Sequence, residues 1–268
     1  IMDVARRHRL AVVEDCAHCH GGEWDGKKLG TIGDVGCFSF QGALINDKPV
    51  ASGEGGMAVT NNRDLFERML LFSQLNRVGL EKDFTNPRFR ALAPTNLGLK
   101  FRPHPWSMAL GLIHLESLDY RNEQRARYRQ HIYDGLADIS CIDPIRPSPK
   151  AKDRGFYGGF HFIYQPQKLG DLPTERLIEA LTAEGVDMKH REYELCHLMK
   201  LFSEGFDIYG RGVGPLVEDY RGYFPGDFPI SEEVHGRILG MPAFIEPEPG
   251  YADQVIHAFH KVTAQADA

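Results

Sequence analysis

The sequence predicts an α/β protein with a mostly parallel sheet, followed by a smaller α+β domain. In the first third of the 268 residues, short apolar runs alternate with glycine-rich turns and helical patterns, as in the βα units that build parallel sheets. Farther along, a helical pattern without internal proline runs over residues 106–137, which is long enough to leave one domain and enter the next. We therefore predict two domains, residues 1–115 and residues 116–268.

The strands of the first domain follow from local patterns. Residues 1–9 have the apolar spacing of a helix, so the chain opens within one and we expect further sequence upstream. Residues 10–14 (LAVVE) form an apolar run that is typical of a parallel strand buried on both faces. Two more strands are predicted at residues 35–40 and 57–60, each after a glycine-rich turn.

The later elements are predicted in the same way. Asn62 can cap a helix over residues 63–75, which carries an apolar stripe. Four prolines within residues 83–105 predict a loop. Beyond the long helix we predict a strand at 160–165, a helix from Thr174 that Gly185 ends, a loop-rich stretch at 190–228, and closing helices at 231–239 and 251–264.

Composition excludes several classes of function. The net charge is −6 and the basic residues are scattered, which argues against binding nucleic acid or an anionic membrane. No stretch reaches the roughly 18 to 20 apolar residues that a membrane span needs, and the N-terminus has no signal-peptide pattern. Five cysteines, an odd number, indicate a reduced, cytoplasmic setting.

The residues that carry chemistry lie between positions 12 and 60. Asp15 follows the first predicted strand at its C-terminal end, where open α/β sheets bind ligands. A carboxylate there can hold a protonated heterocycle nitrogen, such as the pyridinium of pyridoxal phosphate. A turn or helix-capping aspartate is the alternative interpretation.

Ser39 and Lys48 are the other two candidates in this stretch. Ser39 stands between two phenylalanines in a predicted strand, where its hydroxyl can bond to the backbone or to a ligand phosphate. Lys48 comes shortly before a glycine-rich turn, and partial desolvation there can lower the pKa of a lysine enough for it to form a Schiff base. An exposed loop lysine is the alternative.

Three motifs in a fixed order resemble the DegT/DnrJ/EryC1/StrS family of sugar aminotransferases. They are Asp-Cys-Ala-His at 15–18, Gly-Asp-Val-Gly-Cys-Phe-Ser-Phe-Gln at 33–41, and Lys48 followed by Gly-Glu-Gly-Gly at 53–56. The segment at 98–105, which leads into a helix, and the Leu-Gly-Met-Pro at 239–242 are also similar to the family, so the resemblance covers nearly the whole chain.

The resemblance implies a pyridoxal-phosphate-dependent fold-type I aminotransferase, with residues 1–115 as the C-terminal part of its large cofactor-binding domain. Lys48 would bind the cofactor covalently and shuttle a proton, and Asp15 would pair with the pyridine nitrogen. His18, where many members have glutamine, would contact the ring or its 3-hydroxyl, and Ser39 would bind the phosphate.

The resemblance also implies a homodimer with shared active sites. Lys100, which stands where asparagine is common, and Arg102 would reach the site of the neighbouring subunit. His197 falls in a segment that helps to form the substrate pocket in the family, although packing is an equal alternative. The stretch between Gln41 and Lys48 is longer than usual, and further phosphate contacts are expected upstream.

The implied reaction moves an amino group from glutamate or glutamine to a nucleotide-linked keto-sugar or a keto-cyclitol. Two alternatives remain: a sugar dehydratase on the same scaffold, in which histidine replaces the lysine, and a non-catalytic subunit that pairs with an active partner. Cys16, His18, Cys19 and His20 could suggest zinc, but their spacing suits one tetrahedral ion poorly, and we predict no metal site.

Overall fold

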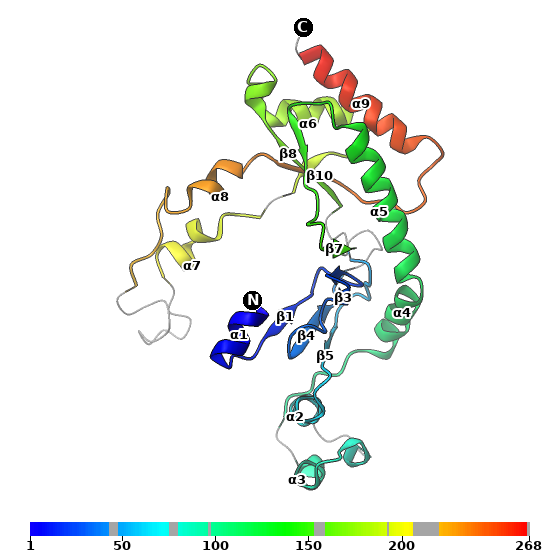
Figure 1. The fold of residues 1–268 in the computed structure, drawn as a ribbon, viewed down its shortest axis with the longest axis vertical. Coiled ribbons are helices and arrows are strands. Elements are labelled where there is room, and N and C mark those ends of the chain that lie inside the picture. Colours follow the sequence, from blue (N-terminus) through cyan, green and yellow to red (C-terminus); the bar gives the residue numbers. More distant parts are fainter. Residues whose placement is uncertain are drawn as a thin grey trace. The chain divides into compact units, whose positions relative to one another are not determined.

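The computed structural model describes residues 1–42, 48–74, 80–95, 98–152, 159–191, 193–205 and 220–266 (Figure 1). The chain divides into two compact units. Unit 1 comprises Ile1–Tyr128, Arg146–Gly159 and Ala243–Glu246; unit 2 comprises Arg129–Ile145, Phe160–Pro242 and Pro247–Ala268. The predicted domain boundary near residue 115 stays a prediction.

Unit 1 contains a three-stranded sheet in the order β1-β4-β5, formed by Val13–Asp15, Val35–Ser39 and Gly56–Val59. Helix α1 (Met2–His8) precedes β1, which pairs with β4 in parallel and sets Asp15 opposite Cys37. Strand β5 pairs antiparallel with β4, because the chain returns without the crossover that a parallel neighbour needs. The α/β class is confirmed, with a mixed sheet.

Two acidic side chains hold the turn at residues 30–34 beside β1. The Glu14 carboxylate accepts hydrogen bonds from the backbone nitrogens of Gly30 (3.0 Å), Ile32 (2.7 Å) and Gly33 (2.7 Å). The Oδ2 of Asp34 accepts a hydrogen bond of 2.7 Å from the backbone nitrogen of Val12, just before β1. These bonds fix the start of β4 beside β1 and so set where Asp15 and Ser39 emerge.

Gly36 is required by a close approach of two backbones. A Cβ at this position would overlap the carbonyl oxygen and Cα of Gly30. We expect Gly36→Ala to lower the free energy of unfolding by about 1–3 kcal/mol, the usual cost of overpacking, as measured by chemical denaturation. Gly111→Ala is the control, because a Cβ there would make ordinary contact with Ser52, and equal losses in both variants would contradict this explanation.

Short helices follow β5 and enclose a small core of their own. They are α2 (Arg63–Ser73), η1 (Leu80–Asp83), α3 (Pro87–Leu92) and η2 (Ala93–Thr95). The predicted cap is confirmed, since the Asn62 side chain accepts from the backbone nitrogens of two residues in the first turn of α2. The predicted loop at 83–105 is wrong in part, because Asn86 caps α3 and a proline occupies its first position.

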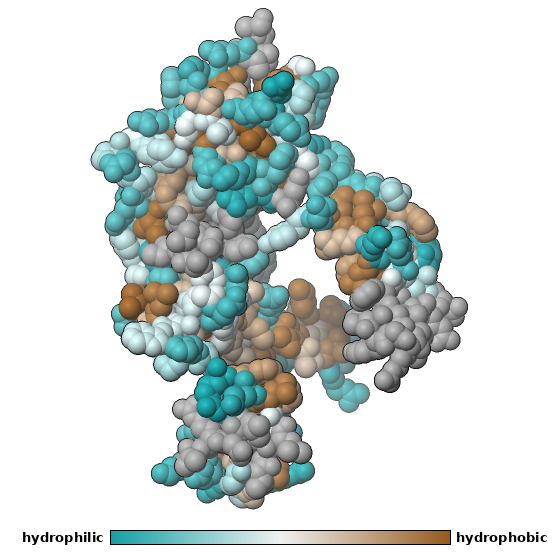
Figure 2. All heavy atoms as spheres, turned by 180° about the vertical axis from the view of Figure 1, so that it is seen from behind, coloured by the Kyte–Doolittle hydropathy of each residue, from teal (hydrophilic) through white to brown (hydrophobic). Residues whose placement is uncertain are grey.

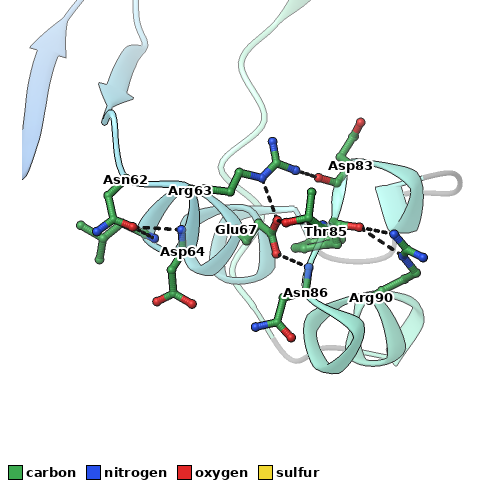
Figure 3. Close-up of polar contacts among 10 residues, drawn as sticks. Asn62, Arg63, Asp64, Glu67, Asp83, Thr85, Asn86 and Arg90 are labelled. Carbon is green, nitrogen blue, oxygen red and sulfur yellow. Dashed lines mark hydrogen bonds and ion pairs between the residues drawn. The ribbon is translucent and has the colours of Figure 1, made fainter.

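A buried carboxylate joins these helices (Figure 3). Glu67 of α2 is 1% exposed and accepts from Arg63 Nε (2.7 Å), from the nitrogen (2.8 Å) and hydroxyl (2.5 Å) of Thr85, and from the nitrogen of Asn86 (3.1 Å). Burial acts to raise the pKa of Glu67, but these hydrogen bonds lower it from 4.5 to about 2. Phe84, Phe89 and Ala93 form the core beside it.

The predicted long helix is interrupted. It consists of α4 (Pro105–Glu116) and α5 (Leu118–Gly135), separated at Ser117. The Ser117 hydroxyl lies 3.3 Å from the carbonyl oxygen of Ile113 and so competes with the backbone ladder. None of the helices among the described residues combines the length and apolar character needed to cross a bilayer. A small antiparallel sheet of β2 (Glu23–Trp24), β3 (Lys27–Lys28) and β7 (Ala151–Lys152) completes unit 1.

Unit 2 contains a four-stranded antiparallel sheet in the order β6-β8-β10-β9. Its strands are Ile142–Pro144, Phe160–Tyr164, Ile238–Met241 and Lys189–His190. Helices α6 (Thr174–Ala183) and α9 (Tyr251–Ala266) contribute buried apolar side chains, among them Leu177, Leu181, Val255 and Phe259. The remaining elements are η3 (Pro166–Lys168), η4 (Cys196–Leu198), α7 (Lys200–Ser203) and α8 (Pro229–Val234).

The predicted helix at 231–239 is wrong in its second half. Helix α8 ends at Val234, and Gly236 follows with a φ of +81°, a conformation that favours glycine. The apolar run after it becomes β10, which lies between β8 and β9, because its side chains are buried in the sheet.

Candidate active site

Lys48 lies in the connection between β4 and β5, close to the end of β4. Its side chain is buried, with 4% exposed, and its Nζ lies 2.7 Å from Ser39 Oγ and 3.5 Å from Gln41 Oε1. Lys48 is therefore not the exposed loop lysine of the alternative interpretation. Residues 43–47, which contain the longer stretch predicted before the lysine, lie outside the described residues.

The hairpin that carries Lys48 is closed by glycines. Gly42 and Gly53 exchange backbone hydrogen bonds of 2.9 Å in both directions, and Ser52 donates to the carbonyl oxygen of Phe40 at 2.8 Å. The pairing of β4 with β5 thus continues beyond the strands. It brings the two ends of the connection together and turns the lysine back toward Ser39.

Asp15 ends β1, as predicted, and its side chain is exposed. Its Oδ1 accepts a hydrogen bond of 3.0 Å from the backbone nitrogen of Ala17, which is the turn role of the alternative interpretation. Among the described residues, Oδ2 accepts no hydrogen bond. One carboxylate oxygen therefore shapes the turn, and the other is available to a ligand.

His18 links the acid and the amine electrostatically. Partial desolvation lowers the pKa of His18, the charge of Lys48 lowers it further, and the charge of Asp15 acts in the opposite direction. The imidazole thus lies within reach of the fields of both side chains. The structure brings Asp15, His18, Ser39 and Lys48 to the same end of the sheet of unit 1.

His20, one of the four residues that could suggest zinc, packs beside two aromatic rings. It is buried, and its ring centroid lies 5.8 Å from that of Phe38 and 6.1 Å from that of Phe40. Burial, with the charge of Lys48 as a smaller cause, lowers the pKa of His20 to about 4, against an opposing contact with the Ser39 backbone. The ring is therefore neutral near pH 7. Within the described ranges no group of three or more His, Cys, Asp and Glu side chains is arranged to hold a metal ion.

This set of donors fits pyridoxal phosphate. A buried amine beside a hydroxyl suits attack on an aldehyde, because the low exposure shields the amine from water. The available oxygen of Asp15 suits a pyridinium, and the Ser39 hydroxyl suits a phosphate oxygen. The assignment of these roles stays a prediction.

Lys100 and Arg102 lie elsewhere in unit 1. They line an open cavity of about 900 Å³ together with apolar side chains that include Met57, Phe66 and Phe72. Lys48 and Asp15 do not line this cavity. Among the described residues that line this cavity, none is a nucleophile as buried as Lys48, and the assignment of the chemistry to Lys48 stays a prediction.

His197 lies in unit 2 and is held by packing and by an acid. It is 8% exposed, its Nε2 lies 2.9 Å from Glu232 Oε1, and its ring packs on Phe228 at 4.8 Å between centroids. Hydrogen bonds from the Gly226 backbone, and then from His197, lower the pKa of Glu232. These contacts account for the burial of His197 by packing, and its role in a substrate pocket stays a prediction.

Comparison with known proteins adds a family, relatives and a fold. A model of the DegT/DnrJ/EryC1/StrS aminotransferase family matches residues 1–260. The L-glutamine:scyllo-inosose aminotransferase of Streptomyces griseus is 32% identical over 269 residues, covering 98% of this chain and 61% of the relative. The GDP-perosamine synthase of Caulobacter vibrioides is 39% identical over 127 residues, covering 47% of this chain and 31% of the relative.

A crystal structure shares the fold. The aminotransferase from Psychrobacter cryohalolentis aligns with a TM-score of 0.75 at 23% identity, over 100% of this chain and 65% of that one. The chain spans about half to two thirds of the length of the curated relatives it matches, with 46% and 62% for two of them.

Proposed function

Since this chain belongs to the DegT/DnrJ/EryC1/StrS aminotransferase family, we propose that it transfers an amino group from glutamine or glutamate to a keto-cyclitol or a nucleotide-linked keto-sugar. The observation that carries the proposal is the buried amine of Lys48, 2.7 Å from the hydroxyl of Ser39. The names of the relatives support both acceptor classes, because one acts on scyllo-inosose and another is a GDP-perosamine synthase.

Pyridoxal phosphate, when bound, supplies the electron sink that stabilises negative charge at the donor Cα. Lys48 would hold the cofactor through Nζ, and its amine, when free, would carry a proton from and to the donor and acceptor carbons. Its burial would protect this proton transfer from water.

The other residues bind and orient. Oδ2 of Asp15 holds the proton on the pyridine nitrogen, while Oδ1 stays bonded to Ala17 and fixes the carboxylate. His18 contacts the ring or its 3-hydroxyl. Ser39 would donate its hydroxyl hydrogen to the phosphate, and its oxygen can accept from Lys48 Nζ at the same time.

We further propose a homodimer in which Lys100 and Arg102 reach the partner's site. The support is a set of exposed apolar side chains on α4 (Figure 2), namely Trp106 at 81%, Leu112 at 57%, Ile113 at 61% and Leu115 at 55%. Exposed apolar side chains of this size suit burial against a second copy of the chain.

The five free cysteines support a reducing, cytoplasmic setting.

Transfer of labelled nitrogen tests the function. The protein is loaded with pyridoxal phosphate and incubated with glutamine labelled at its α-nitrogen, and with either scyllo-inosose or a nucleotide-linked keto-sugar. We expect the label in the acceptor by mass spectrometry. Loss of water from the acceptor without gain of nitrogen would indicate the dehydratase, against which Lys48 argues. Bound cofactor without any conversion of either acceptor would favour the non-catalytic subunit.

A further inference from the structure

We propose that His114 and Arg121 are positioning residues that aim Lys48 by fixing the backbone immediately after it. The inference rests on the proposed function only in taking Lys48 as the reacting amine. Both residues lie at the junction of α4 and α5, far from Lys48 in sequence, and both are buried, with 8% and 5% exposed.

Two side chains hold the segment 49–51, one as a hydrogen-bond donor and the other as an acceptor. The Nη2 of Arg121 donates a hydrogen bond to the carbonyl oxygen of Pro49, and it also donates to the carbonyl oxygen of His114 at 2.6 Å. The Nδ1 of His114 accepts from the backbone nitrogen of Ala51 at 3.2 Å. One carbonyl and one N–H, two residues apart, are thus fixed to the same helical junction.

Among the described residues, these are the side-chain hydrogen bonds to the backbone of residues 49–51, next to Lys48. Proline at position 49 has no N–H, and no other side chain of the described residues bonds to the backbone of residues 49–51. The next backbone anchor is Ser52, which donates to Phe40. His114 and Arg121 therefore fix the backbone between Lys48 and Ser52.

The chemistry of the pair favours a positioning role over simple packing. Arg121 is a buried cation, and among the described residues its Nε and Nη1 have no hydrogen-bond partner. A buried charge without a carboxylate costs stability, and an apolar side chain would fill the same volume more favourably. His114 must present a bare Nδ1, which requires a neutral ring, and burial and then the charge of Arg121 lower its pKa in that direction.

The test uses substitutions that keep, move or remove the hydrogen-bonding group of His114 or Arg121. His114→Asn places an oxygen near the position of Nδ1, whereas His114→Gln places it one bond farther out. Arg121→Met removes the donor, and Arg121→Lys keeps one. Phe89→Leu, in the separate core beside α3, is the control for loss of stability without change at the site.

Two readouts are measured well below the melting temperature of each variant. One is the rate at which Lys48 captures pyridoxal phosphate, followed by absorbance. The other is the pKa of the Lys48 amine in cofactor-free protein, followed by NMR after isotopic methylation of lysines and assigned by its loss in Lys48→Arg. The second readout needs no cofactor, so it reports on the positioning even if the proposed function fails.

We expect His114→Gln and Arg121→Met to slow capture by about 10-fold or more, because a misplacement of ~1 Å can cost up to 10²-fold, and to shift the amine pKa. His114→Asn and Arg121→Lys should recover most of the rate, and Phe89→Leu should change neither readout. Wild-type capture and amine pKa in both His114→Gln and Arg121→Met would overturn the proposal. A wild-type protein that never captures the cofactor would instead refute the proposed function.

Discussion

Replacing Lys48 by alanine is expected to abolish covalent capture of pyridoxal phosphate and to lower amino transfer by at least about 10³-fold, because the amine is both the attachment point and the proton carrier. The amine lies buried beside the Ser39 hydroxyl, a position that suits both roles. Absorbance of the loaded protein and the label-transfer assay measure the two losses separately.

The matched control is Lys27→Ala, since Lys27 is an exposed lysine of β3 in the same unit. It should retain full capture and transfer. Lys48→Arg keeps the positive charge but offers no amine, so it should behave like Lys48→Ala. An absorption band of the bound cofactor that survives both substitutions would remove the assignment of Lys48.

Glu67→Gln is expected to give a large loss of stability, with a melting temperature lower by on the order of 5 °C or more. The amide directs an NH₂ group at a donor that the carboxylate of the buried Glu67 now satisfies, and it removes the charge partner of the half-exposed Arg63. Hydrogen exchange should increase most in the small core around α2 and α3.

The same substitution should change the response to acid. The pKa of Glu67 is lowered from 4.5 to about 2 in the folded state, so its contribution to stability is complete above pH 4.5 and is lost as the pH falls toward about 2. Wild-type protein should therefore lose stability through this window more steeply than Glu67→Gln. Asp64→Asn, which alters an exposed pair with Arg68, is the control, and identical acid profiles for wild type and Glu67→Gln would contradict the account.

Local patterns predicted much of the fold, and they failed where tertiary contacts decide. The strands near residues 35 and 57 could be predicted because each apolar run follows a glycine-rich turn. The strand near residue 13 could be predicted from its apolar run, but its expected burial on both faces is wrong, since Leu10 and Val13 are 59% and 65% exposed. The break at Ser117 could not, because serine is tolerated in many helices and only the structure shows its hydroxyl bonded to the carbonyl oxygen of Ile113. The sequence predicts helix where β10 begins, because a short apolar run fits either period.

The candidate site also contains some residues that the sequence predicts and others that only the structure reveals. Asp15, Ser39 and Lys48 could be proposed from motif order alone, and the structure brings them to one end of the sheet. His114 and Arg121 could not, since their contacts with the lysine segment span 63 and 72 residues and leave no periodic trace in the sequence.

A crystal structure of the protein loaded with pyridoxal phosphate would examine both ends of the proposed ring site in one experiment. We predict continuous density from Lys48 Nζ to the cofactor, and an Asp15 oxygen within about 3 Å of the ring nitrogen, the usual hydrogen-bond distance. A cofactor joined to another lysine, or a ring nitrogen facing away from Asp15, would contradict the account.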